Sequence, residues 1–154
     1  MDRTRLISMW DRAWTEGLWA ASWSASLEGL TPAEASWQPA NAPGIAGTRH
    51  AIWQIVLHMC LWREHWLKKL QGGGTPKEEL DRLNFPPIAD ASETAWADAR
   101  QRFARTQHDI SAALKNPATT DAHFEAIAHF LPHDCYHFGQ INTIRAMLGK
   151  KPLE

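Results

Sequence analysis

The sequence predicts an all-α protein, a four-helix bundle with a long connection between its second and third helices. Apolar residues recur at spacings of three and four along four long stretches. No stretch alternates with the two-residue period of a β-strand, and Gly, Pro and capping residues separate the four stretches. A chain of 154 residues suits one domain, residues 1–154, that buries a full core without disulfide or metal staples.

The first stretch predicts a helix over about 3–28, followed by a short turn. Asp2 can cap its start and Gly29 its end. Its apolar residues follow one stripe and then a shifted one: Leu6, Trp10, Trp14 and Leu18, then Trp19, Trp23 and Leu27. The capping box Thr31-Pro32-Ala33-Glu34 predicts one helical turn that ends by Trp37, before a loop over 38–47.

The second stretch predicts a helix over about 49–70, capped by Thr48 and stopped by three glycines at 72–74. One face of it carries Ile55, His58, Trp62 and His65. The connection over 75–91 contains a second capping box that starts at Thr75 and a Phe-Pro-Pro breaker. A connection of this length can cross over the bundle instead of making a tight hairpin.

The third stretch begins at Asp90 with Glu93 and closes at Asn116-Pro117. Its apolar face is marked by Trp96, Phe103, Ile110 and Leu114.

The fourth stretch begins at Thr120 or Asp121 and ends at Gly149 with Pro152. Pro132 interrupts it, and because proline lacks an N–H and clashes with the preceding turn, a kink or a restart is expected there.

Composition excludes several classes of function. Lys and Arg number 16 against 17 Asp and Glu, with no basic stripe, which argues against nucleic acid as a partner. No apolar run reaches the ~18 residues that span a bilayer, and no signal peptide is present. Cys60 and Cys135 form no CxxC motif, which indicates reduced thiols in a cytoplasmic protein. Nine Trp indicate core filling, although some could line a ligand pocket.

Histidines supply the candidate site. His133 and His137 lie four residues apart, on one helix face, where two imidazoles can close on one ion. A zinc-like site needs a further ligand from another helix. His58 is the best candidate because it lies among apolar residues and should point inward. From the residues alone, core histidines with hydrogen-bond partners, or a surface pair, remain the alternative.

The remaining histidines and both cysteines are weaker candidates. His65 lies two turns from His58, about 10 Å along the axis, which is too far to share an ion. His129 precedes His133 by one turn and could be a partner of that ligand or line a channel. Two helical steps rotate a side chain by about 200°, so Cys60 and Cys135 should point away from the histidines and pack in the core.

Two polar residues flank the C-terminal histidine pair. Asp134 should point off the metal face, as a surface or capping group. Gln140 lies one turn beyond His137 and could orient that ligand.

Two segments then resemble a known family. The letters HDCYHFGQI over 133–141, followed by Arg145 and Leu148-Gly149, resemble the C-terminal signature of the DinB-like (DinB/YfiT-like) superfamily. The letters IWQIVLH over 52–58, continuing to Trp62, resemble its first motif, an apolar helix that ends in His. The order of the motifs and the chain length also match, so the resemblance extends over nearly the whole chain.

The resemblance implies a four-helix bundle, often a homodimer, that holds one divalent metal ion, nickel or zinc, through three histidines. Carried over residue by residue, these ligands are His58, His133 and His137. Some relatives are enzymes that use small cofactor thiols, and many have no assigned reaction. The family name implies no DNA chemistry.

Three hypotheses follow for the function. The first is a metal-dependent enzyme, a hydrolase or a small-thiol-dependent transferase, acting on a small-molecule substrate. The second is a non-catalytic module for ligand binding or stress response, in which the metal is structural or absent. The third is a subunit whose Trp-rich helix faces serve dimerisation.

Overall fold

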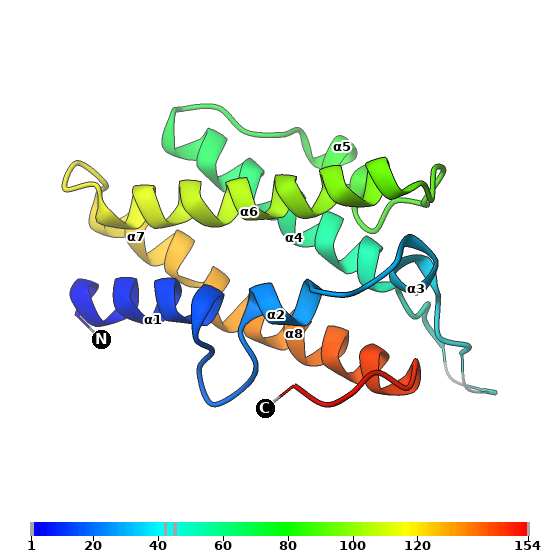
Figure 1. Ribbon diagram of the computed structural model, residues 1–154. Helices are drawn as coiled ribbons and strands as arrows, with labels where there is room; N and C mark the ends of the chain where they lie inside the picture. Colours follow the sequence, from blue (N-terminus) through cyan, green and yellow to red (C-terminus); the bar gives the residue numbers. More distant parts are fainter. Residues whose placement is uncertain (1, 42, 45, 154) are drawn as a thin grey trace.

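The computed structural model describes residues 2–41, 43–44 and 46–153, which form eight α-helices and no strand (Figure 1). The all-α prediction is therefore confirmed for the described residues. The helices are α1 (Arg3–Thr15), α2 (Trp23–Leu27), α3 (Pro32–Ser36), α4 (Ile52–Leu70), α5 (Lys77–Leu83), α6 (Glu93–Lys115), α7 (Asp121–Ala128) and α8 (Phe130–Met147).

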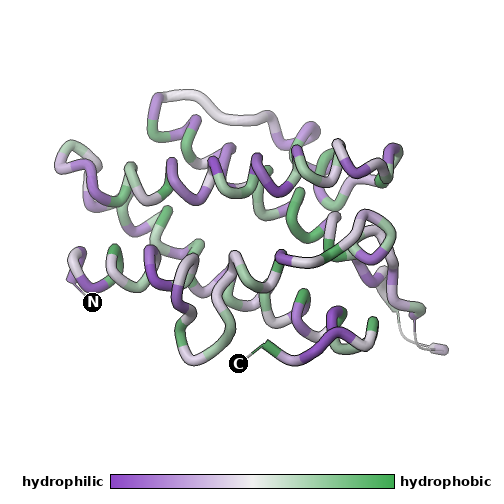
Figure 2. The backbone as a smooth tube through the Cα atoms, in the orientation of Figure 1, coloured by the Kyte–Doolittle hydropathy of each residue, from purple (hydrophilic) through white to green (hydrophobic). Residues whose placement is uncertain are grey.

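Helix α4 is the centre of the bundle. It packs most extensively on α6 and also contacts α3, α5, α7 and α8, while α1 packs against α6 and α2. Hydrophobic and hydrophilic segments alternate along the helices in Figure 2, as expected where each helix turns one apolar face to a shared core. The largest fully buried apolar side chains are Trp10, Trp96, Phe103, Ile52, Met59, Ile110 and Leu114.

The predicted helix over 3–28 is wrong in its middle, because it breaks into α1 and α2. The carbonyl of Arg12 accepts hydrogen bonds from the N–H groups of both Glu16 and Gly17, which closes the last turn of α1. Gly17 adopts φ +88°, and a Cβ there would lie 2.0 Å from the Ala20 carbonyl oxygen. The chain then turns, and Ser22 caps α2.

Three of the predicted helix starts are confirmed. Asp2 caps α1 by accepting a hydrogen bond from the N–H of Arg5. Thr31 and Glu34 form the capping box of α3. Thr120 caps α7 by accepting a hydrogen bond from the N–H of His123. The loop predicted over 38–47 contains no helix in its described part, and residues 42 and 45 lie outside the described residues.

The predicted caps at Thr48 and Thr75 are wrong. Helix α4 begins at Ile52, where the Gln54 side chain accepts a hydrogen bond from the Ala51 N–H. Helix α5 follows Pro76 without a side-chain cap, and the Thr75 backbone N–H donates a hydrogen bond to Nδ1 of His65 on α4. The start of α6 also differs slightly from the prediction, because Ser92 is its N-cap, not Asp90.

The long connection between α4 and α6 is confirmed, and it holds α5 against α4. Just after α5, the chain passes beside the middle of α4, where Asn84 and Phe85 contact the candidate site. The connection therefore supplies functional residues as well as spanning the bundle.

Pro132 produces the predicted restart of the last helix. Helix α7 ends at Ala128, and Pro132 is the third residue of α8. The first turn of a helix needs no internal N–H partner, so proline is tolerated there. None of the helices in the described part of the chain combines the length and the hydropathy that a membrane span requires.

Candidate metal centre

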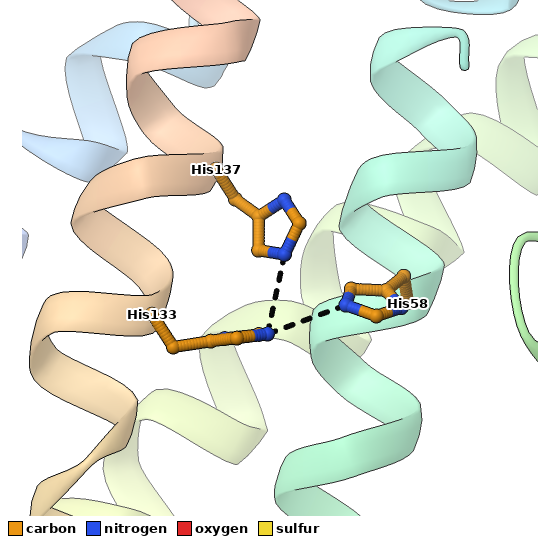
Figure 3. A group of neighbouring side chains, drawn as sticks. All are labelled: His58, His133 and His137. Atoms are coloured by element: carbon orange, nitrogen blue, oxygen red, sulfur yellow. Dashed lines mark hydrogen bonds between the residues drawn. The ribbon is translucent and has the colours of Figure 1, made fainter. Parts of the chain in front are cut away.

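Three histidine rings from two helices meet inside the bundle (Figure 3). His58 comes from α4, and His133 and His137 come from successive turns of α8. The Nε2 atom of His133 lies 3.3 Å from Nε2 of His58 and 3.2 Å from Nε2 of His137. One nitrogen of each ring lies within 4.8 Å of the other two. The three predicted side chains therefore do converge on one point.

The local fold explains the position of His133. Its N–H donates to the His129 carbonyl over 3.2 Å, so the helical hydrogen bond directly after Pro132 is intact. The proline therefore does not displace the ring that follows it. His137 then lies one turn further along the same face of α8.

The opposite nitrogen of every ring faces an oxygen atom. Nδ1 of His58 lies 2.6 Å from Asn84 Oδ1, Nδ1 of His133 lies 2.7 Å from Asp134 Oδ1, and Nδ1 of His137 lies 2.8 Å from Gln140 Oε1. A carboxylate only accepts hydrogen bonds, so Nδ1 of His133 carries a proton. With the same tautomer in each ring, the three Nε2 lone pairs point at one another.

This arrangement fits a cation. With this tautomer in all three rings, the Nε2 lone pairs repel one another unless a positive charge lies between them. With a proton on Nε2 of one ring, the contacts of 3.2 and 3.3 Å are the hydrogen bonds drawn in Figure 3. Two nitrogens bound to one zinc ion at 2.0–2.1 Å with a tetrahedral angle are about 3.3 Å apart. The two contacts made by His133 match that separation.

Burial keeps two of the rings neutral. It lowers the pKa of His58 to about 4, although the hydrogen bond to Asn84 opposes the shift. Burial also lowers the pKa of His137 below its usual value, against the hydrogen bond to Gln140. At neutral pH these rings therefore have the unprotonated nitrogen that a metal requires.

The prediction for Asp134 is wrong, because its carboxylate is fully buried. One helical step from His133 turns it toward α4, not to solvent. There Asp134 Oδ2 accepts hydrogen bonds from Arg63, at 2.8 Å from Nε and 2.6 Å from Nη2. Nη1 of the same guanidinium donates to Thr106 Oγ1, and the Phe103 ring lies against its carbon. Asp134 thus contacts both His133, a candidate metal ligand, and Arg63 in the core.

Sequence reasoning missed Arg63, Asn84 and Phe85. Arg63 is the first charged residue of α4, after eleven uncharged ones, and this was the signal that could have identified it. Asn84 also accepts a hydrogen bond from the Trp62 indole N–H, which orients its amide. The Phe85 ring stacks on His58 with centroids 4.1 Å apart. Asn84 directly precedes the Phe-Pro-Pro breaker and Phe85 is its first residue, and the breaker carried no signal of a site.

The other candidates take different places. Gln140 orients His137, as predicted. His65 stays apart, and its Nδ1 accepts the Thr75 N–H. His129 is exposed and lines a cavity beside the cluster.

The two thiols differ from each other. Cys60 is buried as predicted, and burial raises the pKa of its thiol to about 12. The prediction that Cys135 is also buried is wrong. The rotation that turns it away from the histidines places it on the outer face of α8.

Comparison with known proteins gives one result. A family model described as the DinB superfamily matches residues 15–141, a span that includes all three histidines. No curated protein and no solved structure matches the chain.

Proposed function

We propose that this chain, which belongs to the DinB superfamily, binds one divalent metal ion through Nε2 of His58, His133 and His137 and acts as a metal-dependent enzyme. The observation that carries the proposal is the pairing of every Nδ1 atom with an oxygen, which directs all three Nε2 atoms to a common point. Imidazole ligands suit nickel and zinc equally, so we propose one of these two ions.

A divalent ion held by three neutral imidazoles supplies Lewis acidity and lowers the pKa of a water or thiol that binds it. Among the described residues, no carboxylate or thiol joins the three histidines as a fourth ligand. The chain therefore leaves room for an external molecule. Asp134 holds the proton on Nδ1 of His133, and Arg63 balances the charge of that carboxylate.

We propose that the enzyme is either a hydrolase or a transferase that depends on a small thiol. Glu125 and His129 line the cavity beside the cluster, and their side chains are of the types that act as general acids or bases. Both are exposed, so they can exchange protons with solvent.

The test begins with protein purified without added metal. Elemental analysis should find about one nickel or zinc ion per chain. The chelated protein should lose activity in hydrolysis and thiol-transfer assays and recover it with one of the two ions. Full activity without any bound metal would overturn the enzyme proposal.

A non-catalytic ligand-binding or stress-response module is the second candidate, favoured by the cavity of about 650 Å³ next to the histidines. Under this reading, small-molecule binding survives chelation and no reaction is found. Thermal melting with and without chelator, combined with a ligand screen, separates the two candidates.

Family membership also supports a homodimer and a cytoplasmic location as proposals. Neither Cys60 nor Cys135 is in a disulfide, as expected in a reducing compartment. Trp10, Trp23, Trp53 and Trp96 are buried in the core and do not supply a dimerisation face, whereas Trp19 and Trp37 are exposed. Sedimentation at high protein concentration tests the dimer, and a strictly monomeric profile would remove it.

A further inference from the structure

A cavity of about 650 Å³ lies against the histidine cluster. His58 and His133 form part of its wall, so a molecule inside it reaches two of the three rings. The volume is within the range of pockets that bind small organic molecules. The other lining residues are Trp62, Trp66, Asn84, Ala122, Glu125, Ala126, His129 and Phe130.

Three aromatic side chains make the wall of the cavity largely apolar. Trp62 and Trp66 come from α4, and Phe130 comes from the first turn of α8. Apolar atoms dominate the wall, and such walls bind flat apolar groups through burial and ring stacking.

The charged groups that line the cavity also favour an uncharged substrate. Neither Lys nor Arg is among its lining residues, and Glu125 supplies a carboxylate at the rim. The side chains of the wall therefore offer an anionic substrate no lysine or arginine to pair with.

A second cavity, of about 680 Å³, differs from the first in having an arginine in its wall. Its lining includes Gln140, Arg49, His50 and Tyr136, but none of the three histidines. An anionic group therefore has an arginine partner there and no lysine or arginine partner in the first cavity.

We propose that the cavity between α4, α7 and α8 is the substrate pocket of the site and takes an uncharged organic molecule with an aryl or similarly flat apolar group. This inference rests on the proposed function, because the reacting polar atom of the substrate must face a metal ion held by the histidines. The aromatic wall then holds the apolar part of the molecule.

The test measures binding of two probes, imidazole and 4-phenylimidazole, to the zinc-loaded protein by calorimetry. Both probes offer a nitrogen to the metal, and only the second offers an aryl group. Burial of the phenyl ring should tighten binding by about tenfold or more. Metal-free protein should bind 4-phenylimidazole much more weakly than zinc-loaded protein.

A matched pair of variants locates the aryl group. Trp66→Ala removes one cavity wall without removing a hydrogen-bond partner of any of the three histidines, so it should reduce the advantage of 4-phenylimidazole several-fold and leave imidazole binding unchanged. Trp19→Ala, which removes a fully exposed tryptophan, should change neither. If Trp66→Ala does not fold, the difference in affinity between the two probes on the unaltered protein is the test of the proposal.

The possible failures are distinguishable. A protein that takes up neither zinc nor nickel refutes the proposed function itself. Zinc uptake with equal affinity for the two probes refutes the substrate pocket and leaves the metal site standing. Equal binding of 4-phenylimidazole with and without zinc also refutes it, because the aryl group would then lie elsewhere.

Discussion

Arg63 and Asp134 form an ion pair of 2.6 Å in which both side chains are completely inaccessible to solvent. The same carboxylate holds Nδ1 of His133 at 2.7 Å. The pair therefore belongs to the core and to the candidate metal centre at once. Stability of the bundle and orientation of one ligand are linked through a single carboxylate.

The ion pair leads to a prediction about stability. Arg63→Met should lower the free energy of unfolding by about 3–5 kcal/mol, because it leaves the buried Asp134 carboxylate without its cation. Arg63→Met combined with Asp134→Leu should recover much of that loss, since no buried charge remains. Urea unfolding of the metal-free variants measures both effects. A loss below about 1 kcal/mol in the single variant would contradict the account.

Gln140 provides a way to change a ligand partner without changing a buried charge. Gln140→Met removes the oxygen that faces Nδ1 of His137 and should weaken zinc binding about 10- to 100-fold. Gln140→Glu keeps an acceptor there and should retain most of the affinity. Competition with a zinc-binding dye measures the affinities, and thermal melting of the metal-free forms should show little change. Unaltered zinc affinity in Gln140→Met would show that the hydrogen bond does not matter.

The lowered pKa of His58 predicts how the stability of the metal-free protein depends on pH. The unfolded chain takes up a proton on this residue near pH 6.5, while the folded protein does so only near pH 4. The unfolded state therefore binds more protons between these values, and stability falls as the pH is lowered from 6.5 to 4.5. Urea unfolding in the presence of a chelator measures the slope. His58→Gln should flatten it, and an unchanged slope would argue against a buried neutral ring.

Gly17 and Gly139 should respond oppositely to substitution by alanine. Gly17→Ala should destabilise the protein by about 1 kcal/mol or more, because φ is +88° and the new Cβ would meet the Ala20 carbonyl. Gly139 lies within α8 with open space around it, so Gly139→Ala should stabilise by about 0.5–1 kcal/mol. Thermal unfolding measures both. Stabilisation by Gly17→Ala would mean that the break between α1 and α2 is not required.

Periodicity and capping predicted most of the helical architecture. They failed at the break after α1 because the apolar stripe continues past it, whereas the local signal of the break is the single glycine at position 17, which ends the helix with a positive φ. The starts of α4 and α5 were misplaced because Thr48 and Thr75 look like caps locally. The start of α4 is instead marked by the hydrogen bond between Ala51 and Gln54, and Thr75 contacts His65 of α4 through its backbone.

The three histidines could be predicted, since two share a helix face and the third lies in an apolar helix. Their supporting residues could not, except for Gln140, which lies one turn from its ligand. Asp134 was predicted to be at the surface because its partner Arg63 is on another helix. Asn84 and Phe85 come from the connection between α4 and α6, whose path over α4 no local pattern specifies.

The most direct test of the central claim is calorimetric titration of zinc into metal-free protein, compared with the single variants His58→Ala, His133→Ala and His137→Ala. The account predicts one site per chain in the unaltered protein and at least a hundredfold weaker binding in each variant, since each histidine supplies one of only three protein ligands. The variant His108→Ala, which removes an exposed histidine that is not part of the cluster, should bind zinc normally. Full stoichiometry and affinity in His133→Ala would contradict the account, because that ring links the other two.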